Sequence, residues 1–88
     1  MSVDQIDALH RRVIIRLDEY TLIITGVSKF TRQVEEWPTA WLSHVLTSDA
    51  DDFSLCVELE LGRVEVVGRD LRLIRNSDMA ILIPAIDD

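Results

Sequence analysis

The stretch Phe53-Ser54-Leu55-Cys56-Val57-Glu58-Leu59-Glu60-Leu61 decides the fold of this chain of 88 residues. Its five apolar residues alternate with four residues that are mostly polar. Successive side chains of a β-strand point to opposite faces, so the apolar groups share one face and the others share the opposite face. The pattern therefore predicts a strand over 53–61 with one face on a hydrophobic core.

Alternation of the same kind extends from this segment in both directions along the chain. The turn cluster Gly68-Arg69-Asp70 and the cluster Asn76-Ser77-Asp78 interrupt it, as residues that favour turns do between strands. The alternation predicts further strands over about 11–18, 20–27, 63–68, 70–75 and 79–84.

The spacing of these strands predicts how they pair. Gly62-Arg63 fits a two-residue hairpin loop with glycine at its first central position. Residues 53–84 are therefore expected to form a four-stranded antiparallel meander. Residues 11–27 are expected to form a separate hairpin that turns near Asp18-Glu19.

The N-terminal segment has the features of a helix. Ser2 and Gln5 form a capping box ahead of Ile6 and Leu9, which predicts a helix over residues 3–10.

A second helix is predicted in the middle of the chain. Trp41 and Val45 are four residues apart, as are Leu42 and Leu46, and this spacing places each pair on one helical face. We expect that helix at about 38–47. Residues 28–37 before it are expected to form a separate turn or short helix.

These elements predict an α+β fold. The chain is short enough for one domain only, residues 1–88. We expect an antiparallel sheet or a small open barrel of about six strands, with the two short helices packed on one face.

The charge of the chain is concentrated in one segment. No lysine or arginine lies between Gln33 and Gly62, whereas seven carboxylates do. Without these seven, nine acidic residues remain against nine basic ones, so the net charge of −7 belongs to this segment. A phosphate backbone or an anionic membrane surface requires a surplus of basic residues, and both are excluded as expected partners.

The aspartates of this segment do not predict a metal site. In a calcium loop of the EF-hand type that starts at Asp49, the fifth position needs a ligand and the sixth a glycine. Phe53 and Ser54 occupy those positions. We expect Asp49, Asp51 and Asp52 to form a solvated acidic loop before the strand.

No catalytic motif is present either. Cys56 would need His10 or His44 within hydrogen-bond reach to act as a nucleophile, and its alternation places it beside Glu58 and Glu60, whose charges disfavour a thiolate. The sequence contains no triad, no glycine-rich phosphate loop and no metal-ligand spacing. We expect a protein that is not an enzyme and has no cofactor; a small enzyme or ligand-binding domain is the least favoured alternative.

Acidic residues beside two tryptophans predict a docking surface for a basic protein. The leading hypothesis is a non-catalytic binding protein of the kind represented by immunity proteins and phage-encoded inhibitors. One alternative is a scaffold protein that forms a homodimer through the strand 79–84, and another is that the charge only keeps the chain soluble. The expected partner-binding residues are Glu35, Glu36, Trp37, Trp41, Asp49, Asp51 and Asp52.

The cellular setting is predicted from the cysteine content and the apolar runs. Cys56 is the single cysteine, so no internal disulfide can form, and a reducing cytoplasm is the expected location. The longest apolar runs, such as Ala80–Ile83, are far too short to span a bilayer.

Two short runs resemble segments of small sporulation-associated β proteins. They are Leu22-Ile23-Ile24-Thr25-Gly26-Val27 and Leu59-Glu60-Leu61-Gly62-Arg63-Val64. The resemblance consists of alternating aliphatic residues punctuated by glycine, and it assigns no functional residue.

Overall fold

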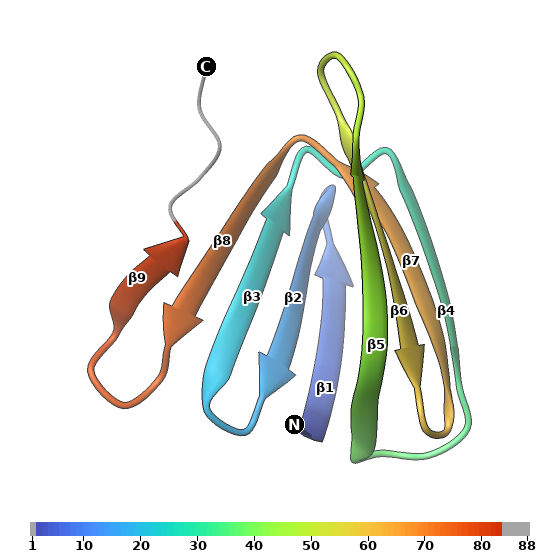
Figure 1. The fold of residues 1–88 in the computed structure, drawn as a ribbon, viewed down its shortest axis with the longest axis vertical. Coiled ribbons are helices and arrows are strands. Elements are labelled where there is room, and N and C mark those ends of the chain that lie inside the picture. Colours follow the sequence, from blue (N-terminus) through green and yellow to red (C-terminus); the bar gives the residue numbers. More distant parts are fainter. Residues whose placement is uncertain (1, 84–88) are drawn as a thin grey trace.

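The computed structural model describes residues 2–83 as a single antiparallel sheet, and the side chains of residues 2–79. Nine strands pair in the order β4-β7-β6-β5-β1-β2-β3-β8-β9 (Figure 1). No residue in this range is helical, so the expected α+β class is wrong and this part of the chain is all-β. The strands are β1 (Ser2–Leu9), β2 (Arg12–Leu17), β3 (Tyr20–Thr25), β4 (Lys29–Val34), β5 (Thr39–Ser48), β6 (Phe53–Leu59), β7 (Gly62–Gly68), β8 (Asp70–Arg75) and β9 (Ala80–Ile83).

A β-bulge explains why the expected helix over 3–10 is wrong. Val3 pairs with Leu17 and Gln5 with Arg16, so Asp4 is an extra residue in β1. Such an insertion brings residues three apart onto the same face of a strand, which is also the spacing of a helical face. Val3 and Ile6 are both buried for this reason.

A second bulge explains the error over 38–47. The register of β5 against β6 shifts between Trp41 and Ser43, so Trp41 lies on the core face of the sheet and Val45 on the outer face. Their four-residue spacing therefore does not place them on one face, as it would in a helix. Valine, threonine and tryptophan also suit a strand. The expectation of a turn or short helix over 28–37 is wrong in part, because Lys29–Val34 is strand β4.

The hairpin over 11–27 is confirmed, whereas the meander over 53–84 is wrong. β2 and β3 pair around the turn at Asp18-Glu19. β6 and β7 form the next hairpin, but their turn is Glu60-Leu61 and not Gly62-Arg63. β8 then pairs with β3 instead of β7. The strand predicted over 79–84 is present as β9, and residue 84 lies outside the described residues.

Two long bent strands connect the halves of the sheet. β3 runs through Gly26 towards β4, and β7 runs through Gly68 into β8. β3 pairs with β8 in one half and β4 pairs with β7 in the other. Between them, the Ser28 amide donates to the Val67 carbonyl at 2.8 Å and the Arg69 amide to the Thr25 carbonyl at 3.0 Å.

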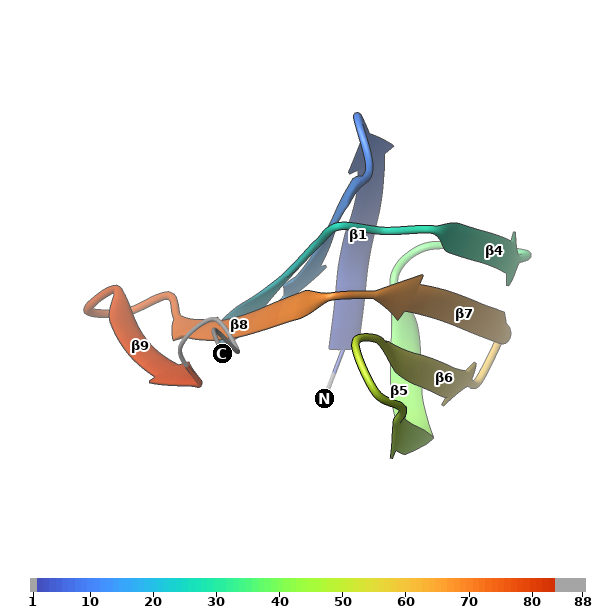
Figure 2. The same cartoon turned by 90° about the horizontal axis from the view of Figure 1, so that it is seen from above.

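The bend places the core between the two halves. Seen from above, β8 and β9 extend to one side and β4, β7, β6 and β5 to the other, with β1 between them (Figure 2). Arg32 of β4 closes part of the gap, because its Nη1 donates to the Ile6 carbonyl of β1 at 2.9 Å. The buried core residues are Val3, Ile6, Val13, Ile15, Leu17, Leu22, Ile24, Val27, Phe53, Leu55, Val57, Leu59, Val64, Val66 and Leu71.

The close approach at Gly68 gives a direct test of this crossing. A Cβ atom at Gly68 would lie 2.7 Å from Cγ2 of Ile24 and 3.2 Å from the Thr25 carbonyl oxygen. We expect Gly68→Ala to lower the free energy of unfolding by about 1–3 kcal/mol, because the two strands must separate to admit the methyl group. Urea titration measures the change.

Thr31→Ala is the control, because Thr31 is exposed on β4 and its loss is expected to change stability by no more than about 0.5 kcal/mol. A Gly68→Ala protein as stable as the control would contradict the close crossing.

Candidate functional site

The predicted partner-binding residues do not form one surface. Glu35, Glu36 and Trp37 lie in the loop between β4 and β5, whereas the three aspartates lie in the loop between β5 and β6. These loops are at opposite ends of β5 (Figure 1). A strand of ten residues is about 30 Å long. A charge cluster that is continuous in sequence is therefore divided in space.

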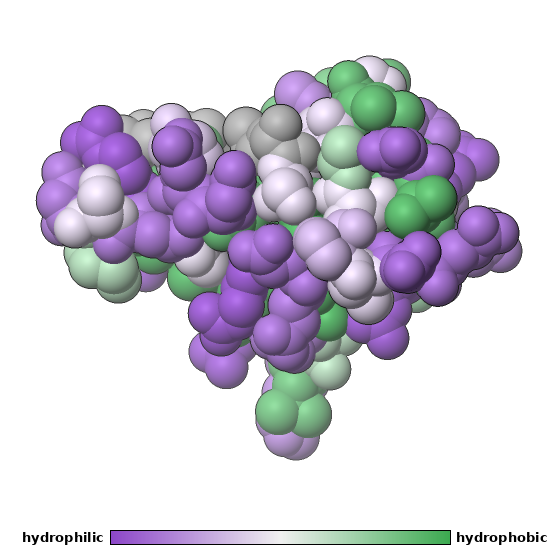
Figure 3. Space-filling view, turned by 90° about the horizontal axis from the view of Figure 1, so that it is seen from below, coloured by the Kyte–Doolittle hydropathy of each residue, from purple (hydrophilic) through white to green (hydrophobic). Residues whose placement is uncertain are grey.

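The end with the β4–β5 loop is acidic. The β2–β3 turn brings Asp18 and Glu19 to the same end, and Glu60 lies in the β6–β7 turn there (Figure 1). The Glu35 amide donates to the Leu61 carbonyl at 2.9 Å and joins two of these loops. The surface of this end is mostly hydrophilic, with separated hydrophobic areas (Figure 3).

The two tryptophans have different environments. Trp41 is partly buried and packs against the core, and its Nε1 donates to Nδ1 of His44 at 3.2 Å. The two rings meet edge to face with centroids 5.5 Å apart. Trp37 is 37% exposed in the acidic end. Trp41 is therefore a packing residue, and Trp37 is the tryptophan with the more accessible side chain.

Most of β5 has hydrogen-bonding partners on one side only. Thr39 and Ala40 pair with β1, and from Trp41 onward the strand pairs with β6. The segment Leu42–Ser48, which we call the β5 edge, has no strand on its other side among the described residues. It protrudes towards the β5–β6 loop (Figure 1).

The β5 edge exposes apolar side chains on both faces of the sheet. Leu46 pairs with the buried Leu55, so it lies on the core side, yet it is 50% exposed. Val45 pairs with Cys56 on the outer face. Val45 and Leu42 are each 64% exposed. The core thus extends along β6 but does not cover the facing part of β5.

The β5–β6 loop places its carboxylates at the end of this edge. The Asp49 amide donates to the Asp52 carbonyl at 2.8 Å, and the Asp49 carboxylate accepts from the Ala50 amide at 2.8 Å. Asp52 lies 3.9 Å from Nε of Arg69 in an exposed ion pair. Across residues 2–83, no group of three histidine, cysteine, aspartate or glutamate residues is arranged to hold a metal ion.

Cys56 belongs to a charged cluster on the outer face of β6 and β7. Arg63 lies opposite Glu58 at 3.3 Å and contacts Glu65 at 2.7 Å, and its Nη2 lies 3.4 Å from the Cys56 sulfur. Cys56, followed by Glu65 and Glu58, raises the pKa of the Arg63 guanidinium above its ordinary value. His44 pairs with Val57 and so lies on the other face, and a Cys56–His44 dyad does not assemble.

The structure also reveals a basic hollow that the sequence did not predict. It has a volume of about 500 Å3 and lies at the end of the molecule opposite the acidic end. Its arginines come from two turns that are remote in sequence, so composition and net charge did not reveal it. The residues that line it are Leu9, His10, Arg11, Arg12, Thr25, Gly26 and Arg69.

No family model, curated protein or solved structure matches this chain. The resemblance to sporulation-associated β proteins thus gains no support, and no functional residue is transferred from a relative. None of the described segments is a helix of the length and apolar character needed to cross a membrane.

The contrast between Trp41 and its neighbour is testable by mutation. Trp41→Ala is expected to lower the free energy of unfolding by about 2–4 kcal/mol, since it removes an aromatic ring that packs on the core. Leu42→Ala on the same strand removes an exposed side chain and is expected to cost no more than about 0.5 kcal/mol. Chemical denaturation of both variants measures this difference, and equal losses would contradict the assignment.

Proposed function

We propose that this chain is a non-catalytic binding protein whose β5 edge accepts an extended segment of a basic partner protein. The observation that supports the proposal is the combination of a one-sided strand with exposed apolar side chains. Within the described part of the chain, the backbone from Ser43 to Ser48 pairs with β6 alone, while Leu42, Val45 and Leu46 are exposed.

An edge strand offers a row of amide and carbonyl groups to which another strand can add. Proteins that avoid this reaction protect such edges with lysine, proline or a covering element. The β5 edge has the sequence Leu42-Ser43-His44-Val45-Leu46-Thr47-Ser48, with neither lysine nor proline. The only interruption is the bulge at its start. The edge is therefore suited to strand addition.

The sign of the charge favours a basic partner. Asp49, Asp51 and Asp52 lie at the end of the edge, and the ion pair between Asp52 and Arg69 is long and exposed. The net charge of −7 adds a long-range attraction for a basic protein. A second copy of this chain would carry the same charge, which opposes self-pairing. We place this role in the cytoplasm, on the basis of the single cysteine.

A titration with defined peptides tests the proposal. The probe is a peptide of alternating valine and lysine, and its counterpart has glutamate in place of lysine. We expect the lysine peptide to shift the amide resonances of Leu42–Ser48 in NMR spectra and to bind about tenfold or more weakly at high salt, where steering is screened. The glutamate peptide is not expected to bind.

Variants with charged edges separate strand addition from general attraction. Leu42→Lys with Val45→Lys places positive charges on the edge and is expected to abolish binding of the lysine peptide. Ser77→Lys with Met79→Lys is the control with the same added charge, because both residues are exposed and lie between β8 and β9, remote from β5 in the sheet order. Resonance shifts confined to the acidic end, or equal binding of both peptides, would contradict the proposal.

Self-association through the C-terminal strand is the second candidate. β9 pairs with β8 and forms one end of the sheet, so it presents an edge of its own. Sedimentation of the free chain at the titration concentration distinguishes the two functions. A dimer that dissociates on Met79→Lys would support the scaffold and count against the β5 edge.

A further inference from the structure

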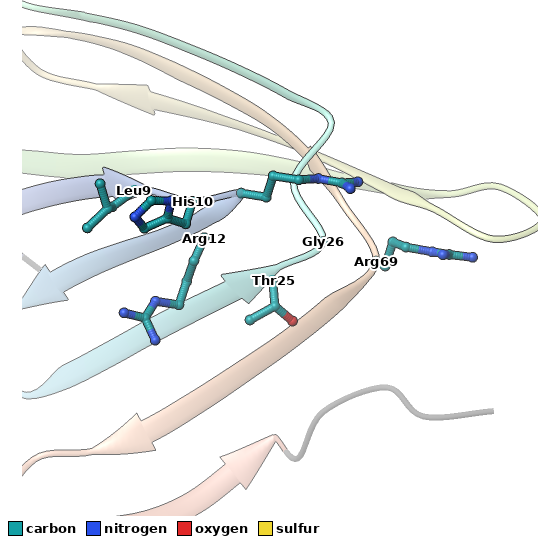
Figure 4. Close-up of a pocket in the computed structure, with 7 residues that line it drawn as sticks. Leu9, His10, Arg12, Thr25, Gly26 and Arg69 are labelled. Atoms are coloured by element: carbon teal, nitrogen blue, oxygen red, sulfur yellow. The ribbon is translucent and has the colours of Figure 1, made fainter.

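A basic hollow in this acidic protein lies where two turns meet. The β1–β2 turn contributes His10 and Arg11, and the bend at Gly68 places Arg69 opposite them. The floor contains Thr25 and Gly26, and a Cβ atom at Gly26 would lie 2.9 Å from Cγ of Arg69. Thr25 and Gly26 lie between the backbone positions of Arg12 and Arg69, whose side chains point away from each other (Figure 4).

The three arginines of the hollow keep most of their hydrogen-bonding capacity. Nε of Arg11 donates to the Val27 carbonyl at 3.2 Å, which holds its side chain without neutralising it. Among the described residues, the Arg69 side chain has one ionic contact, the exposed 3.9 Å pair with Asp52. The side chain of Arg12, a residue whose backbone pairs with β1 and β3, makes no hydrogen bond or ion pair with any residue of the described range. A local surplus of positive charge therefore exists despite the overall negative charge.

The β1–β2 turn is built from residues that do not favour its conformation. His10 and Arg11 have φ angles of 52° and 60°, as in a type I′ turn, where asparagine and glycine are preferred. Positive φ values in residues with a side chain are strained, and such strain often accompanies a functional role. The turn thus presents an imidazole and a guanidinium group to the hollow, where the residues Asn-Gly would form the same hairpin with less strain.

We propose that this hollow binds the phosphoryl group of a small phosphorylated molecule. Guanidinium groups match phosphate oxygens with paired donors, and the Thr25 hydroxyl adds a further donor on the floor. The guanidinium groups of Arg12 and Arg69 lie apart in Figure 4. Both side chains must therefore turn inward to contact one phosphoryl group, and both are exposed.

The size of the hollow favours more than a phosphate ion. Its volume of about 500 Å3 falls in the range of small-molecule sites, which is about 300–1,000 Å3. Leu9 is 64% exposed and lines one side. It provides an apolar contact for the part of the ligand that carries the phosphate.

NMR titration with three probes tests this site. The probes are adenosine 5′-monophosphate, inorganic phosphate and adenosine. We expect the nucleotide to shift the amides of Leu9–Arg12, Thr25, Gly26 and Arg69 and to bind more tightly than phosphate, with adenosine giving no shift. Arg12→Gln with Arg69→Gln is expected to weaken nucleotide binding about tenfold or more.

Arg16→Gln with Arg72→Gln is the matched control. It removes the same charge from exposed arginines that do not line the hollow, and it is expected to leave nucleotide binding unchanged. Equal weakening by both double variants would show only a general charge effect and overturn the proposal. So would a nucleotide that gives no shifts, or adenosine that binds as well as the nucleotide.

Replacement of the strained turn gives an independent readout. His10→Asn with Arg11→Gly introduces the preferred turn residues, so the free energy of unfolding is expected to stay level or rise while nucleotide binding weakens. A purely structural role for His10 and Arg11 predicts unchanged binding. Nucleotide binding as tight as in the native chain would therefore contradict the assignment.

Discussion

The structure depends on the crossing of two bent strands, where Gly68 lies against Ile24 and the backbone of Thr25. Because β3 leads into β4 and β7 into β8, both strands belong to both halves of the sheet. Their bend folds one sheet over its own hydrophobic face, so a chain of 88 residues buries a core without helices in the described range. A side chain at Gly68 would force the halves apart.

The same bend accounts for the exposed edge of β5. β1 and β5 are neighbours in the sheet, but they pair only through Ser2 with Ala40 and Val3 with Thr39. Beyond those pairs, β6 is the one described strand that pairs with β5. The core contacts end near Trp41, and the rest of the strand carries apolar side chains without cover. The candidate binding surface is thus a consequence of how the sheet closes on itself.

Local alternation predicted most strands but could not predict their partners. Residues 53–59, with a strict two-residue period, form β6 as expected. In β1 a bulge brings Val3 and Ile6 onto one face, and this spacing of three residues has the same appearance as a helix. In β5 the four-residue spacing of Trp41 and Val45 resembles a helical face, but the bulge places the two residues on opposite faces of the sheet. The pairing of β8 with β3 joins residues that are about fifty positions apart in the sequence, and a run of alternating residues carries no information about such partners.

The candidate sites show a similar limit. The seven clustered carboxylates are evident from the sequence, but six of them lie in loops that are divided between the two ends of the molecule, and Glu58 lies within β6. The cross-strand pairing of Glu58 with Arg63 could be predicted from two neighbouring antiparallel strands, because opposite charges favour facing positions. The basic hollow could not be predicted, since Arg11, Arg12 and Arg69 come to line the same hollow only after the strands cross. Net charge describes the whole chain and conceals such local differences.

The most direct test of the account is amide hydrogen exchange along β5 in the free protein. From Ser43 to Ser48 the register with β6 is regular, so successive amides point alternately towards β6 and towards the open edge. We predict slow and fast exchange in alternation along this segment. Uniform protection would mean that the outward-pointing amides also have hydrogen-bond partners, and it would contradict the open edge on which the proposed function rests.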